Sequence, residues 1–137
     1  MQESPDVRSA WLEFCDRLTA GDVASFDRLV SSDPATVVIG TAPGEIVRER
    51  ERLRFGFEAE GVGLRSRNPS AYEEGTLGWL TDEADFVFPD GSAMDCRMTV
   101  LFCREDERWK LLHMHASVGV PDEEVLELQR RWAAGPS

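Results

Sequence analysis

The sequence predicts an α+β domain in which helices come first and an antiparallel sheet follows. Apolar residues recur at helical spacing from Val7 to Leu18. Beyond Gly61, long alternating segments are separated by turn signals, which is the pattern of a meandering antiparallel sheet. A length of 137 residues suits one hydrophobic core, so we expect residues 1–137 to form a single domain.

The N-terminal third of the chain carries two helix signals. Ser4 can cap a first helix, and Gly21 is placed to end it. Asp22 can cap a second helix, whose apolar residues run to Val30. We therefore expect a helical hairpin before the sheet.

The next elements are shorter and end in a further helix. Residues 35–40 are apolar and β-branched, which predicts a buried strand. A third helix is expected over about 46–60, and its arginine-rich run, 48–52, is interpreted as a solvated face with internal ion pairs. At the other end of the chain, an amphipathic helix is predicted over about 122–133.

Three long strands make up the predicted sheet. They span about 72–88, 93–103 and 109–118. The segment Phe88–Ser92 is a strong hairpin signal. Glu105–Arg108 forms a second turn, although its glutamate at position 107 is a poor choice where positive φ favours glycine.

Charge and composition exclude several classes of partner. The chain has 15 basic and 26 acidic residues, and a net charge of −11 repels phosphate backbones and anionic lipid. We therefore expect no nucleic acid and no membrane as partner. No leader signal and no membrane-spanning stretch is visible. Cys15, Cys96 and Cys103 lack zinc or redox spacing and indicate a reducing compartment, so a cytoplasmic location is expected.

These segments resemble the SnoaL-like branch of the nuclear-transport-factor-2-like (NTF2-like) superfamily, which includes ketosteroid isomerases. The motifs that carry the resemblance are Gly21-Asp22, Asp33-Pro-Ala-Thr-Val37, Arg97-x-Thr99, and Arg104-Glu-Asp-Glu-Arg-Trp109 leading into Leu112-His-Met-His-Ala-Ser117. The closing piece is also similar to the association domain of calcium/calmodulin-dependent protein kinase II. The resemblance implies a cystatin-like cone, with a curved sheet around a helix, an internal pocket, and a dimer formed through the outer sheet face.

The turns decide which residues share a face of the sheet. An even loop centred on Asp106 and Glu107 pairs Thr99 with Met114, and paired residues lie on the same face. An even loop at Asp90-Gly91 extends the same pairing to the first long strand. A three-residue loop at either turn would instead exchange which residues share a face. Matched to the isomerases, the pocket face then holds Asp82, Ala84, Phe86, Asp95, Arg97, Thr99, Leu101, Leu112, Met114, Ala116 and Val118. The outer face holds Trp79, Thr81, Glu83, Cys96, Met98, Val100, Phe102, Leu111, His113, His115 and Ser117.

Steroid isomerisation itself is rejected. Its chemistry needs a carboxylate base, a tyrosine and a protonated acid. By resemblance these positions fall at Ile39, Phe14 and Thr99, and none of the three has the required group. No acidic residue lies between Asp33 and Glu45 that could replace the base.

The candidate catalytic residues are Asp82, Asp95 and Arg97, the charged groups that the resemblance places in the pocket. In one interpretation, Arg97 forms a structural ion pair with Asp82 or Asp95. In the other, Arg97 anchors a carboxylate, enolate or carbonyl oxygen of a ligand. One of the two carboxylates could then act as a general base if burial raises its pKa.

The predicted ligand-binding residues are mostly apolar. The set is Trp11, Phe14, Ile39, Phe57, Phe86, Thr99, Leu101, Leu112, Met114 and Ala116. The helical stripe through Trp11 and Phe14 is more often plain core than ligand wall.

The outer face would meet a partner subunit. The predicted interface residues are Met98, Val100, His113, His115 and Ser117. Two imidazoles on one strand face could share a metal ion, but the chain has only two histidines. An interface role is favoured, and neither a metal nor a cofactor is predicted.

Two functions remain open on these grounds. The first is a homodimeric, cytoplasmic SnoaL-like protein that binds a small, largely apolar molecule in the cone, with acid–base chemistry of the cyclase, isomerase or hydratase type as an option. The second is a non-catalytic association module in which the pocket is a remnant. Whether the chain is an enzyme is left open.

Overall fold

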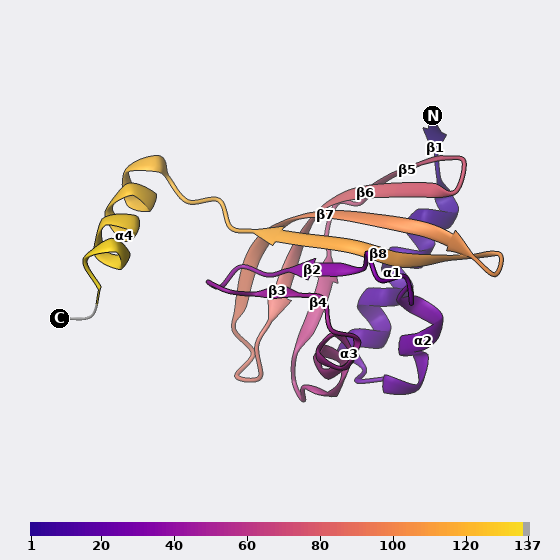
Figure 1. Cartoon of the computed structure of the whole chain (residues 1–137), viewed down its shortest axis with the longest axis horizontal. Helices are drawn as coiled ribbons and strands as arrows, with labels where there is room; N and C mark the ends of the chain where they lie inside the picture. The colour runs from indigo at the N-terminus through magenta and orange to yellow at the C-terminus, as the bar shows by residue number, and fades with distance from the viewer. Residues whose placement is uncertain (136–137) are drawn as a thin grey trace.

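The computed structural model describes residues 1–135 and has the predicted α+β character (Figure 1). The helical elements are α1 (Pro5–Thr19), the short 3₁₀ turn η1 (Val23–Ser25), α2 (Phe26–Leu29), α3 (Arg50–Glu58) and α4 (Asp122–Ala134). The strands are β1 (Gln2–Glu3), β2 (Val37–Ile39), β3 (Ile46–Val47), β4 (Gly63–Ser66), β5 (Ser70–Glu74), β6 (Leu77–Val87), β7 (Ala93–Glu105) and β8 (Arg108–Ser117). Figure 1 shows α1, α2 and α3 against one face of a curved sheet, while α4 stands apart beyond β8.

The first helix begins where its capping chemistry allows. Ser4 Oγ accepts a hydrogen bond from the backbone N–H of Val7 at 3.1 Å, as a helix cap does. The second helix is shorter than expected. The carboxylate of Asp22 accepts from the Ser25 hydroxyl at 2.7 Å instead of capping backbone N–H groups. That segment consequently forms η1 and one turn of α2.

Two further segments differ from the expectation. The strand expected over 72–88 is divided into β5 and β6 by a turn at Gly75, where φ is +60°. Glycine adopts this backbone conformation without steric cost, so the chain reverses and the two strands pair antiparallel. The helix expected from residue 46 begins only at Arg50, since residues 46–47 pair with β2 as β3.

The sheet joins the two halves of the chain. Its strands run in the order β1-β5-β6-β7-β8-β2-β3, and β4 pairs with β6 beside this path. The main meander is antiparallel, as predicted, but β2 lies parallel to β8. This pairing brings the segment after α2 next to the closing strand and places α3 under the same face as α1 (Figure 1).

The turn between β6 and β7 has an odd loop, and this reverses the face predicted for β7. The N–H of Phe88 donates to the carbonyl of Ser92 at 2.8 Å, and Gly91 has φ of +86°. An even loop centred on Asp90-Gly91 would instead put Pro89 in the ladder opposite Ser92. Proline has no N–H to donate to a ladder, so the odd loop is the favoured one.

The turn between β7 and β8 has the predicted even loop, but a bulge follows it. Asp106 and Glu107 form the loop with φ of +51° and +63°. Further along β8, Leu111 and His113 pair with consecutive residues of β7, which leaves Leu112 as the extra residue. A bulge of this kind shifts the register by one and increases the local bend of the strand.

Together, the odd loop and the bulge reverse the faces predicted for β7 and leave the faces predicted for β8 beyond Leu112 unchanged. Asp82 pairs with Met98, and Arg97 pairs with Ser117. The inward residues of β7 and β8 therefore include Cys96, Met98, Val100, Phe102, Leu111, Met114 and Ala116. The outward residues include Asp95, Arg97, Thr99, Leu101, His113, His115 and Ser117.

Candidate functional site

A cavity of about 370 Å³ lies between the inner sheet face and the helices. The sheet contributes residues of β4, β6, β7 and β8 to its wall, and α1, α2, α3, the β2–β3 segment and adjoining loops contribute the rest. The lining is Phe14, Leu18, Phe26, Val30, Val38, Ile39, Gly40, Thr41, Glu45, Val47, Arg52, Leu53, Gly56, Phe57, Ala59, Val62, Leu64, Phe86, Phe88, Met94, Cys96, Met98, Leu111, Met114 and Ala116. Nearly all of these side chains are apolar, which is typical of a small-molecule site.

Sulfur-containing side chains form one wall of the cavity. Met94, Cys96 and Met98 alternate along the inward face of β7, and Met114 adds a third methionine from β8. Methionine is unbranched and polarisable, so it adapts to apolar shapes that a branched side chain would not fit. This wall favours contact with an apolar ligand surface over any single rigid shape.

Aromatic rings form the opposite side. Phe14 contacts Phe57 edge-on at a centroid distance of 5.4 Å, and Phe57 meets Phe26 in the same geometry at 5.6 Å. Trp11 stacks on the far side of Phe14 at 5.7 Å and is fully buried. These edge-on contacts rigidify α1, α2 and α3 around the cavity.

The ionisable side chains that line the cavity are Glu45, Arg52 and Cys96. Glu45 is exposed, and its carboxylate accepts from the N–H of Ala42 at 3.1 Å. Arg52 is exposed and pairs with Glu49 at 3.2 Å. Both charges thus lie at the solvent side of the cavity and leave its interior apolar.

Burial keeps the cavity thiol neutral. The pKa of Cys96 is raised mainly by burial, and nearby Asp95 adds to the effect. The pKa values of Cys15 and Cys103 are also raised, again mainly by burial. A protonated thiol is a poor nucleophile, so Cys96 has no sign of an activated cysteine.

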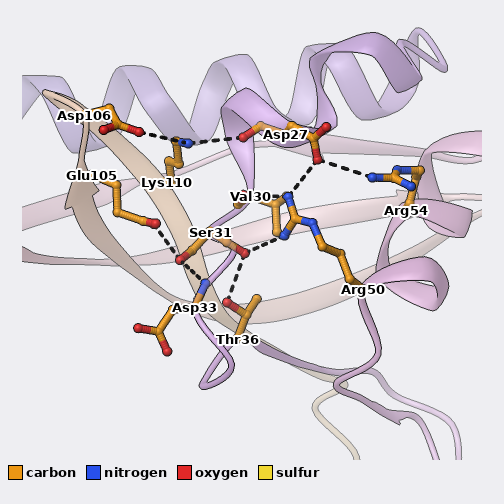
Figure 2. Close-up of polar contacts among 10 residues, drawn as sticks. All are labelled: Asp27, Val30, Ser31, Asp33, Thr36, Arg50, Arg54, Glu105, Asp106 and Lys110. Carbon is orange, nitrogen blue, oxygen red and sulfur yellow. Dashed lines mark hydrogen bonds and ion pairs between the residues drawn. The ribbon is translucent and has the colours of Figure 1, made fainter.

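Figure 2 shows the polar contacts of Arg50, the first residue of α3. Its guanidinium donates to the carbonyl of Ser31 and to the carboxylate of Asp27, both at 2.8 Å. It also lies over the ring of Phe26, 4.8 Å from the centroid. Because Arg54 reaches the same Asp27 oxygen at 3.3 Å, two turns of α3 are tied to α2.

Ser31 is the centre of this polar cluster and is fully buried (Figure 2). Its hydroxyl donates to Glu105 at 2.7 Å and accepts from the N–H of Asp33 at 3.1 Å. Its carbonyl accepts from Thr36 as well as from Arg50. The cluster therefore joins β7, the segment before β2, and α3, and its hydrogen bonds satisfy the buried polar groups of Ser31.

Among the predicted catalytic residues, Asp82 is buried but does not line the cavity. Its carboxylate accepts from the indole N–H of Trp11 at 2.7 Å and from the backbone N–H of Asn68 at 2.8 Å. The N–H of Arg67 is a weaker third donor at 3.4 Å. Asp82 thus binds the strand β6 to α1 and to the segment before β5.

Asp95 and Arg97 are exposed on the outer face. Asp95 forms an ion pair with Arg67, and Asp85 holds Arg65 and Arg67 nearby. The structure does not form the ion pair of the first interpretation, because Arg97 lies on the face opposite to Asp82, and Asp95 pairs with Arg67. The structure does not bring the three predicted catalytic residues together.

The predicted ligand set divides into two groups. Phe14, Ile39, Phe57, Phe86, Met114 and Ala116 line the cavity. Trp11 lies in the core behind Phe14, Thr99 and Leu101 lie on the outer face, and Leu112 is the bulge residue. Contact of any of them with a ligand stays a prediction.

The predicted interface residues also divide. Met98 and Val100 are 4% and 0% exposed and face the core, so their assignment to the outer face is wrong. His113, His115 and Ser117 do lie on the outer face, as predicted. Around them are Thr99 and the half-buried Leu101, a mixed surface of small polar and apolar groups.

The predicted ligand-binding set lacks two parts of the cavity lining. These are the sulfur-containing side chains of β7, and the charged side chains Glu45 and Arg52 at the solvent side. Met98 and Cys96 were excluded by the wrong loop parity at the first turn, for which Pro89 was the available signal. The arginine-rich run predicts a solvated helix face for Arg52, and nothing in its local sequence indicates a cavity.

Two features are absent from the described residues. In residues 1–135, no helix is both long and apolar enough to cross a bilayer. Over the same range, no group of three or more His, Cys, Asp or Glu side chains is arranged to hold a metal ion.

The sequence model of the SnoaL-like domain family matches residues 7–121, from α1 to the end of the sheet. The chain belongs to the SnoaL-like domain family. The matched part contains the cavity and the outer sheet face, whereas α4 lies beyond it. No curated protein matches the chain.

Solved structures of the same fold cover most of the chain. The association domain of calcium/calmodulin-dependent protein kinase II from C. elegans is 19% identical with a TM-score of 0.63, over 82% of this chain and 93% of that chain. An uncharacterised cystatin-like protein from Caulobacter vibrioides is 16% identical with a TM-score of 0.66, over 92% and 96%. An NTF2-like protein from Cytophaga hutchinsonii is 13% identical with a TM-score of 0.71, over 87% and 100%. The fold is therefore NTF2-like, as the resemblance implied.

Proposed function

We propose that this SnoaL-like protein binds a small, largely apolar organic molecule in the cavity. The observation that carries the proposal is the cavity of about 370 Å³ with an almost wholly apolar lining. Ligand pockets of this size and character bury most of the surface of a small molecule, and the hydrophobic effect drives their occupation. The cytoplasm stays the predicted compartment.

The distribution of polar groups suggests how the ligand is oriented. Glu45, Arg52 and Thr41 lie on the solvent side, while Met98 and Phe14 line the interior. A molecule with an apolar body and one polar end would place the body against the sulfur wall and the polar end at the rim. Burial of a polar end inside would leave it without partners, which is costly.

Native mass spectrometry of the purified chain, compared with its denatured mass, tests the binding proposal. We expect extra mass in the native spectrum that is lost on denaturation, or binding of the apolar dye Nile red if the cavity is purified empty. Protection of Cys96 from slow alkylation by the bound molecule would locate the site. An absence of both adduct and dye binding would contradict the proposal.

A pair of variants on neighbouring residues supplies the control. Met114→Trp fills the cavity from β8 and should abolish dye binding. His115→Trp adds the same side chain on the opposite face and should leave dye binding unchanged. Equal dye binding by both variants would place the dye elsewhere.

Acid–base chemistry at the cavity is not part of the proposed function. Catalysis by Asp82, Asp95 and Arg97 stays a prediction, and the cavity lining includes none of them.

A second candidate is an association module that forms a homodimer through the outer sheet face. The fold shared with the association domain of the C. elegans kinase supports this candidate. The central outer residues Thr99, Leu101, His113 and His115 would form the contact. Sedimentation velocity should give a dimer, and Thr99→Arg should produce a monomer that still binds Nile red. A monomeric wild-type chain at micromolar concentration would rule out this candidate and leave the first untouched.

A further inference from the structure

The C-terminal helix α4 carries an apolar stripe that needs a partner. Within its 13 residues none is buried. Val125, Leu128 and Trp132 recur at helical spacing, and Trp132 is 61% exposed. A helix this short is marginal in water unless its apolar face packs against another surface. The stripe on α4 therefore needs a matching apolar surface.

The mouth of the cavity is bordered by exposed apolar side chains. Phe88 lines the cavity and is 38% exposed. Val47, Leu53 and Val62 also line the cavity and are partly exposed. Exposed apolar side chains gathered round an opening are typical of a surface that another element covers.

Each end of α4 is related to the cavity lining, the start through the chain and the end through a groove. At its start, only residues 118–121 separate the helix from β8, whose Ala116 lines the cavity. At its end, Trp132 faces the segment Thr41–Pro43 across a groove, and Thr41 also lines the cavity. Gly119, in the short connection, gives the backbone freedom to change the direction of α4.

The charges of the two surfaces are opposite. The first turn of α4 is acidic at Asp122, Glu123 and Glu124. The segment 48–54 at the start of α3 has four arginines and two glutamates, and Arg52 lies at the rim. Arg50 and Arg54 are paired with Asp27, and Arg52 is paired with Glu49, so the segment keeps a small local excess of positive charge that attracts an acidic helix turn.

We propose that α4 folds over the mouth of the cavity in its own chain and acts as a lid. Its apolar stripe covers the rim around Phe88, and its acidic first turn lies toward the arginines of α3. Closure shields the apolar cavity from water whether the cavity is empty or occupied. The lid is an addition to the SnoaL-like domain, because the family match ends at residue 121.

Paramagnetic relaxation enhancement on the full chain tests the lid without any ligand. The four methionine methyl groups are labelled with carbon-13, and a nitroxide is attached at Glu127→Cys, with Cys103→Ser removing the partly accessible native thiol. We expect strong broadening of Met94, Met98 and Met114, which line the cavity. Met1 serves as the internal control, since it precedes β1 at the opposite edge of the sheet. Cavity methionines that stay as sharp as Met1 would overturn the proposal.

A stripe variant separates docking from random motion of a tethered helix. Leu128→Ser combined with Trp132→Ser removes apolar area only from α4, so the sheet and the methionine chemical shifts should stay intact. Closure buries both side chains, so their loss should lower the ratio of closed to open chains by at least about a hundredfold, and the broadening with it. Unchanged broadening in this variant would show that no specific docking exists.

A mixing experiment separates closure in one chain from exchange of helices between two copies. Nitroxide-labelled chains without carbon-13 are mixed with carbon-13 chains that carry no nitroxide. Sharp methionine signals in the mixture support closure within one chain. Broadening in the mixture would overturn that assignment and show that α4 covers the cavity of a second copy.

Discussion

Asp82 is a buried carboxylate whose partners are N–H groups rather than a cation. The indole of Trp11 and the backbone N–H groups of Asn68 and Arg67 surround its two oxygens. Hydrogen bonds to a charged acceptor are stronger than those between neutral groups. Asp82 therefore holds three segments of the chain together, although the sequence singled it out for chemistry.

Asp82→Asn should destabilise the protein by about 2–3 kcal/mol, since the amide presents N–H groups to donors that then lack an acceptor. Urea unfolding followed by circular dichroism measures the loss. Asp95→Asn is the matched control on the exposed face, and it should change stability by no more than about 0.5 kcal/mol. Equal stability of the two variants would refute the structural role of Asp82.

At the scale of elements, the position of α3 depends on the contacts of Arg50. Arg50→Met removes the hydrogen bonds to Ser31 and Asp27 while keeping much of the apolar stem. We expect a loss of about 1–2 kcal/mol in stability and faster amide hydrogen exchange in α3. Arg52→Met, which breaks only an exposed pair with Glu49, should leave α3 exchange near wild type. Similar exchange in both variants would contradict the anchoring role.

The turn between β7 and β8 holds two non-glycine residues at positive φ. Asp106→Asn with Glu107→Gly supplies the residues that this turn type prefers, and should stabilise the chain by about 0.5–1 kcal/mol. Thermal unfolding measures the gain, and Asp106→Asn alone should give a smaller one. A lower melting temperature of the double variant would show that the glutamate has a compensating contact.

Whether a turn has an even or an odd number of loop residues explains how far the elements could be predicted. The long alternating strands, the cap at Ser4 and the last helix follow from local pattern, and the structure has them. The faces of β7 depended on one residue in one turn, and Pro89 carried the signal that the loop is odd. The bulge at Leu112 has no local signal, because its bend is stabilised by packing against the rest of the molecule.

At the scale of the whole molecule, the cavity was predictable in kind but not in its walls. Apolar residues on α1 and β8 indicated a cone interior, and Phe14 and Met114 line it. The residues of β7 were exchanged with their neighbours, so charged groups were placed inside and methionines outside. Tertiary contacts, such as those of Asp82 with Trp11, are invisible to residue spacing.

The three buried or half-buried thiols make stability fall at alkaline pH. In the unfolded chain a cysteine ionises near its ordinary pKa of 9.0, whereas burial raises the pKa of Cys15 in the folded chain. The folded state then binds more protons than the unfolded state above pH 9, so the free energy of unfolding decreases as pH rises. We expect a loss of about 1 kcal/mol between pH 8 and pH 10 from Cys15 alone.

Urea unfolding at pH 8, 9 and 10 measures this slope. Cys15→Ala should make the dependence on pH weaker by the share that Cys15 contributes. An identical slope in the variant would assign the alkaline loss to other groups.

The single extra residue at Leu112 has a consequence for comparing this chain with its relatives. The extra residue lies inside β8, several residues after the turn at Asp106. In a sequence alignment, a relative without the bulge therefore needs a one-residue gap at Leu112. If that gap is placed in the turn instead, Arg108 to Leu111 are shifted by one position. Leu111, which lines the cavity, would then be compared with a residue from the opposite face of the strand.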